Sequence, residues 1–164
     1  FMILHYFKKK ENTEEKYAKD TYKYILKQSN SFLNKNSFFN HKDYNASFEI
    51  VSIFIIFYIK LNIKFKINNY KLINEELIKI FILDLDESLR EKGIGDMSIG
   101  KYVKKYVKKF YFRLSKFPKD IEDLDFNKFT SYLKYFEFIR NDQKINASKK
   151  IIGIFELISN SYKN

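Results

Sequence analysis

The chain has 164 residues, no cysteine, and 31 Lys and Arg against 20 Asp and Glu, which gives a formal net charge of +11. This length is typical of one domain that buries its own core, and the missing cysteine excludes disulfide scaffolds, thiol enzymes and iron–sulfur proteins. The charge favours an anionic partner, but only Arg90, Arg113 and Arg140 are arginines. Because arginine is the usual residue for bidentate base contacts, sequence-specific DNA binding is not expected.

Helical patterns cover most of the chain, so we expect an all-α fold, a single compact domain of about six helices with a central helical hairpin. The first helix is predicted over residues 13–28, because Asn12 and Glu15 are spaced as in a capping box. The Asn-rich residues 29–45 break the helical spacing and are predicted to form a long loop.

Residues 48–67 form the most apolar stretch. The first half is apolar on nearly all sides, which favours a central buried helix. Residues 59–67 alternate strictly between apolar and polar, as in a half-buried strand, and periodicity leaves helix and strand open there. A membrane-spanning helix needs about 20 mostly apolar residues. The run already contains Glu49 and Lys60, so no spanning segment is expected.

The hairpin is predicted from two neighbouring helical patterns. One helix begins at Asn74 as its cap and ends at Lys92-Gly93, and the next begins near Ser98, with Asp96 or Ser98 as its cap, and stops at Pro118. The second of these helices has a basic face opposite its apolar face, formed by Lys101, Lys104, Lys105 and Lys108. We expect this face to bind an anionic surface, with a merely solvated face as the alternative. Two further helices are predicted over residues 125–141 and 147–159.

Asp84 and Asp86 follow an apolar run and resemble the first motif of haloacid-dehalogenase-like phosphatases, in which the first Asp is the nucleophile and the second the proton shuttle. The helical spacing around them and the short remaining chain count against this interpretation. The alternative is a solvated helix face with Asp86 and Arg90 in contact four residues apart. No catalytic, metal or cofactor site is predicted.

The string of residues 84–101, DLDESLREKGIGDMSIGK, closely resembles the ubiquinol-cytochrome C chaperone family, which has a pattern of the type D-M-D-x-x-L-R-E-x-G-V-G-D-x-x-V-x-K followed by F-Y-G-R. Weaker similarity extends the resemblance to about residues 17–141. The chain departs from the family pattern at Ala46-Ser47, where the family has Gly-Arg, at Ser52, near a usual Leu-His pair, and at Phe112, in place of the Gly of F-Y-G-R.

The resemblance implies a non-enzymatic assembly factor of the cytochrome bc1 complex that needs no cofactor and binds newly made cytochrome b, with a small partner protein and contact to the ribosome or an acidic membrane surface. The competing hypothesis is a basic helical protein that binds RNA or ribosomes without a dedicated client. The resemblance also implies a place at the inner membrane, on the cytoplasmic side in a bacterium or the matrix side in a mitochondrion. The residues of the shared string that we expect to contact client or partner are Asp86, Arg90, Glu91, Gly93, Gly95 and Asp96.

Overall fold

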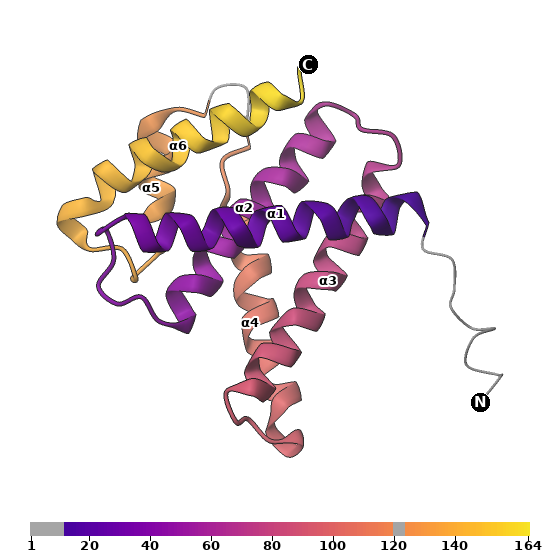
Figure 1. Ribbon diagram of the computed structural model, residues 1–164. Helices are drawn as coiled ribbons and strands as arrows, with labels where there is room; N and C mark the ends of the chain where they lie inside the picture. The colour runs from indigo at the N-terminus through magenta and orange to yellow at the C-terminus, as the bar shows by residue number, and fades with distance from the viewer. Residues whose placement is uncertain (1–11, 120–123) are drawn as a thin grey trace.

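The computed structural model describes residues 12–119 and 124–164, and within these ranges the chain forms six α-helices and one short 3₁₀ turn (Figure 1). The helices are α1 (Thr13–Lys35), α2 (Tyr44–Lys64), α3 (Tyr70–Glu91), α4 (Asp96–Lys116), α5 (Phe126–Leu133) and α6 (Lys144–Ser161), and the 3₁₀ turn is η2 (Asn141–Gln143). The described residues contain no strand, only an isolated β-bridge between Phe39 and Ile139. The predicted all-α fold with a helical hairpin, α3 and α4, is confirmed.

The core is built around α2, which is buried along most of its length. Phe57 is fully buried, and its ring contacts the rings of Phe117, Phe129 and Phe155, which come from three other parts of the chain. By length and composition α2 is apolar enough to cross a membrane, but 78% of its most apolar window is buried within the domain. Its apolar character is therefore accounted for by its place in the core.

The predicted loop over residues 29–45 is wrong at both ends. Helix α1 continues to Lys35, because Ser29, Phe32 and Leu33 extend its buried face, and this burial outweighs the weak helix propensity of the asparagines. Helix α2 then begins at Tyr44, capped by Asp43, whose carboxylate accepts a hydrogen bond from the Ala46 N–H. The predicted start of α1 is confirmed, since Asn12 accepts a hydrogen bond from the Glu15 N–H.

The ambiguous residues 59–67 continue α2 as a helix to Lys64. Leu61 and its neighbour Asn62 are both fully buried, whereas successive side chains of a half-buried strand face opposite sides. The predicted cap at Asn74 is wrong, because α3 begins at Tyr70. Asn74 is instead buried inside α3, where its Oδ1 accepts a hydrogen bond of 2.8 Å from the Asn62 amide.

The helix predicted over residues 125–141 is too long, since α5 ends at Leu133. Beyond it the chain turns and pairs with residues 38–40, where the N–H of Arg140 donates to Phe38 O and the N–H of Asn40 to Phe138 O. This pairing buries Ile139, a contact between distant segments that helical spacing does not reveal. The last predicted helix is confirmed and runs somewhat further at both ends, as α6.

Candidate functional site

The turn of the α3/α4 hairpin is fixed by backbone hydrogen bonds around Gly93. The Gly93 N–H donates to Arg90 O and the Ile94 N–H to Leu89 O, which is the pattern of a Schellman motif. Gly93 has a φ of +89°, a conformation that side-chain-bearing residues rarely adopt. The hairpin therefore depends on glycine at this position, and its turn projects from the molecule, away from α1, α5 and α6 (Figure 1).

A polar cluster joins the two helices across this turn. The Arg90 Nε donates a hydrogen bond of 2.6 Å to Asp86, the predicted contact four residues away, and its Nη1 donates to Asp96 at the start of α4. The pKa of the Arg90 guanidinium is raised above its usual value, mainly by the hydrogen bond to Asp86 and, to a smaller extent, by the one to Asp96. Gly95, not Asp96 or Ser98, is the N-cap of α4, because the Asp96 carboxylate is directed to Arg90.

Of the six residues predicted to contact client or partner, Asp86, Arg90 and Asp96 are brought together, Gly93 and Gly95 shape the turn, and Glu91 is exposed. The sequence prediction missed Met97, whose side chain is fully exposed beside this cluster. An exposed methionine is a flexible apolar contact that adapts to different partners. The hairpin tip, defined here as Asp86, Arg90, Asp96 and Met97, thus presents charge and apolar surface together.

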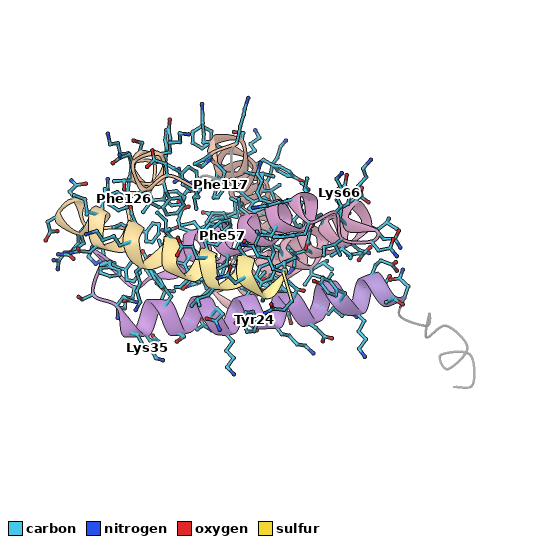
Figure 2. The ribbon with its side chains drawn as sticks, turned by 90° about the horizontal axis from the view of Figure 1, so that it is seen from above. Tyr24, Lys35, Phe57, Lys66, Phe117 and Phe126 are labelled. Carbon is cyan, nitrogen blue, oxygen red and sulfur yellow. The ribbon has the colours of Figure 1, made fainter. Side chains whose placement is uncertain are left out.

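The predicted basic face is present on α4. Lys101, Lys104, Lys105 and Lys108 are all exposed. Figure 2 shows α4 and α5 along the upper edge of the molecule and α1 along the lower edge, so the helix that carries the basic face lies on the side opposite α1. The prediction that these lysines share one exposed face is consistent with this geometry.

A cavity of about 770 Å³ lies beside α4, and a buried ion pair forms part of its lining. Glu49 of α2 and Arg113 of α4 are 2% and 5% exposed, and the guanidinium donates two hydrogen bonds, of 3.0 and 2.9 Å, to the carboxylate. The ammonium of Lys109 lies 2.5 Å from the same carboxylate. In the sequence Glu49 stands out only as an interruption of the apolar run, and no local pattern pairs it with Arg113, 64 residues away.

Comparison with known proteins decides the family. The model of the ubiquinol-cytochrome C chaperone family matches residues 36–135, more than half of the chain. The chain belongs to this family. The match spans α2, the whole hairpin and α5, so the string of residues 84–101 that carries the resemblance is the segment that builds the hairpin turn.

A solved structure has the same fold. The crystal structure of the Cbp3 homolog from Brucella abortus is similar with a TM-score of 0.68 and 22% sequence identity, over 96% of this chain and 88% of that chain. At this identity the likeness shows the fold alone. No curated protein sequence matches the chain.

The departures from the ubiquinol-cytochrome C chaperone pattern fall in two environments. Ala46, at the family Gly, and Ser52, near the usual Leu-His pair, are fully buried in α2, and Ser47, at the family Arg, is half-buried beside Ala46. Phe112, in place of the family glycine, is 44% exposed on α4. The substitutions at Ala46 and Ser52 therefore concern the core, whereas Phe112 changes the surface of this family member.

The phosphatase interpretation is wrong. Asp84 lies within helix α3 and not at the end of a strand, and its carboxylate accepts a hydrogen bond of 2.5 Å from the Tyr22 hydroxyl of α1. Asp84 therefore holds α1 against α3. Within residues 12–119 and 124–164 no group of three His, Cys, Asp or Glu side chains is placed to hold a metal ion.

Proposed function

We propose that the chain is a non-enzymatic assembly chaperone that binds newly made cytochrome b and promotes assembly of the bc1 complex. The observation that carries the proposal is the match of the ubiquinol-cytochrome C chaperone family over residues 36–135. The role needs binding and release of a client but no reacting group, and it needs no cofactor. The polar atoms of the buried Glu49 and Arg113 side chains are satisfied by the two hydrogen bonds between them.

The hairpin tip is the proposed contact with client or partner. A chaperone of a membrane subunit needs apolar surface that is open to solvent, and Met97 supplies it at the end of a projecting element (Figure 1). The Arg90 cluster beside it holds the turn in one conformation through Asp86 and Asp96. A tip with a rigid backbone and a flexible apolar side chain can bind segments that differ in sequence.

Two further contacts belong to the proposal. A small partner protein assists the chain, and the basic face of α4 contacts an anionic surface, either the ribosome or acidic lipid, at the inner membrane. The face carries four exposed lysines, and ammonium groups bind phosphate through charge without base specificity. The alternative, a basic helical protein that binds RNA or ribosomes without a dedicated client, uses the same face and lacks the client contact at the tip.

The experiment is replacement of the natural gene by variants, followed by measurement of bc1 complex accumulation in cells and of stability of the purified protein. Arg90→Ala should lower bc1 accumulation while the free energy of unfolding changes by less than about 1 kcal/mol, as for other exposed ion pairs. Lys79→Ala is the matched control, because Lys79 forms an exposed ion pair with Glu76 on the same helix. If Arg90→Ala unfolds the protein, Arg90 belongs to the fold and the proposed contact at the hairpin tip fails. If loss of the chain leaves bc1 accumulation unchanged, the proposed function fails.

A further inference from the structure

We propose that the outer face of α4 rests on a bilayer that contains acidic lipids, with the ring of Phe112 inserted among the headgroups. The inference rests on the proposed function, in which the basic face contacts an anionic surface, and it identifies that surface as acidic lipid. It does not depend on which client the chain binds. The face is defined here as Lys101, Lys104, Lys105, Lys108 and Phe112.

The helical period places an apolar ring within a row of ammonium groups. Lys101, Lys105, Lys108 and Phe112 follow one another at intervals of four, three and four residues, the spacing of side chains along one face of a helix. All four are exposed. Asp96 is the one acidic residue in the sequence of α4, and it lies at the far end of the helix from Phe112. No carboxylate of α4 therefore interrupts the basic row.

Phe112 belongs to a small aromatic patch. Its ring meets the ring of Tyr135 edge to face at 5.7 Å between centroids, and both side chains are 44% exposed. Tyr111, which precedes Phe112 in the sequence and whose ring contacts Phe110, is also exposed. Aromatic rings flanked by lysines are typical of surfaces that lie at the boundary between headgroups and acyl chains, where the ring is buried and the ammonium groups stay with the phosphates.

The details of the patch favour lipid over single-stranded RNA. RNA recognition relies on arginine planes and on aromatic faces that stack with bases. The guanidinium of Arg113 lies 5.8 Å from the centroid of the Phe112 ring and 4.1 Å from that of Phe136, but it is buried against Glu49, so it offers no exposed plane to a base. The ammonium of Lys116 lies over the Phe112 ring at 5.7 Å from its centroid, so a stacking base would displace it.

The position of the face is suited to a flat partner. Side chains with nitrogen tips extend outward along the edge formed by α4 and α5, on the side opposite α1 (Figure 2). Lys109, whose ammonium contacts buried Glu49, does not take part in the outer row. The charge that meets the bilayer is thus separate from the charge that holds α4 to α2.

The test is sedimentation of the purified protein with vesicles of phosphatidylcholine alone and of phosphatidylcholine with phosphatidylglycerol in a two-to-one mixture. The four lysines of the face are replaced by glutamine in one variant, and Phe112→Gln is a second. The control replaces four exposed lysines of α1, Lys16, Lys23, Lys27 and Lys35, by glutamine, which lowers the net charge equally. Thermal unfolding of each variant shows that it is folded.

We expect the protein to bind the acidic vesicles, and to bind them less as salt is added. Each lysine near an acidic bilayer contributes about fivefold to partitioning, so the α4 variant should lose more than about a hundredfold. The α1 variant should lose less than about threefold, because its lysines face away from the bilayer and long-range attraction is screened. Phe112→Gln should weaken binding to the acidic vesicles by about tenfold, because the polar side chain does not gain the free energy that an apolar ring gains on transfer from water into the bilayer.

Any of four results would overturn the proposal. Equal losses for the α4 and α1 variants would show attraction by net charge alone. Unchanged binding of Phe112→Gln would show that the ring does not insert. Tighter binding of the unmodified protein to single-stranded RNA than to the vesicles, lost in the same α4 variant, would make RNA the partner of this face. Co-purification of cytochrome b with the unmodified protein is measured in parallel. An unmodified protein that captures cytochrome b but does not bind the acidic vesicles would overturn this inference and leave the proposed function intact.

Discussion

Arg113 of α4 donates two hydrogen bonds to Glu49 of α2, and both side chains are almost completely buried. The pair joins the second helix of the hairpin to the core helix. Because a buried charge that loses its partner is costly, Glu49→Ala should lower the free energy of unfolding by about 3–5 kcal/mol. Urea unfolding of the purified variant measures this.

The double variant Glu49→Leu with Arg113→Met removes both charges and keeps apolar volume, so it should be much more stable than Glu49→Ala. Glu76→Ala, which breaks an exposed ion pair on α3, is the control and should cost less than about 1 kcal/mol. A cost for Glu49→Ala as small as that of the control would contradict the structural role of the pair.

Gly93 is the second test of the hairpin, because its φ of +89° strains any residue with a side chain. Gly93→Val should lower the free energy of unfolding by more than about 1 kcal/mol through loss of the left-handed cap. Gly100→Ala is the control within the same hairpin, since Gly100 lies inside α4 with open space around it, and it should be neutral or stabilising by up to about 1 kcal/mol. The account of the turn is contradicted if both variants have the same effect in denaturant unfolding.

The buried tyrosines predict instability at alkaline pH. Burial raises the pKa of the Tyr22, Tyr132 and Tyr162 hydroxyls, and at Tyr22 the hydrogen bond to Asp84 raises it further. Because an unfolded tyrosine has a pKa of about 10, the stabilisation is fully present below that pH and is lost as the pH rises above it.

Tyr22→Phe separates this effect from general alkaline unfolding. At pH 7 the free energy of unfolding of the variant should be lower by about 1 kcal/mol, because the hydrogen bond to Asp84 is removed. Above pH 10 its stability should fall less steeply than that of the natural protein. Urea unfolding at several pH values between 7 and 11 gives both quantities. The same slope in the variant and the natural protein would show that Tyr22 ionises as easily in the fold as in the unfolded chain.

Asn62 and Asn74 form a buried link between α2 and α3, and the Tyr162 hydroxyl donates to Asn62 from beyond α6. Asn74→Ala leaves the Asn62 amide without this acceptor and should cost about 1–3 kcal/mol. The exposed Asn30→Ala in α1 is the comparison and should be neutral or slightly stabilising, because alanine has the higher helix propensity. Thermal unfolding measures the melting temperature of both variants. Equal shifts would contradict a stabilising role of the hydrogen bond between Asn62 and Asn74.

The sequence predicts the parts of this molecule that depend on local signals. Asn12 caps α1, Gly93 ends the first hairpin helix, and the lysines of α4 lie on one face, all because the relevant contacts are within four residues. The polar cluster at the turn is half predicted, since the contact of Arg90 with Asp86 is local, whereas its contact with Asp96 crosses the turn and displaces the expected cap.

The missed features depend on distant contacts. Asn74 is a good cap by sequence, but its amide is used inside the core by Asn62, twelve residues away. The pairing of residues 38–40 with 138–140 ends the expected helix after α5, and the partner of Glu49 is 64 residues away. Helical spacing does not reveal contacts between residues so far apart, so the cavity lined by Glu49 and Arg113 is not predicted from the sequence.

The most direct test of the account is capture of newly made cytochrome b. Cells that express a tagged form of the chain are pulse-labelled, and the labelled proteins that elute with it are identified. We predict that labelled cytochrome b elutes with the natural chain and is reduced at least about tenfold with Met97→Asp, a change that removes the exposed apolar contact at the hairpin tip without altering the core. Elution of no cytochrome b with the natural chain, in cells that make the bc1 complex, would contradict the proposed function.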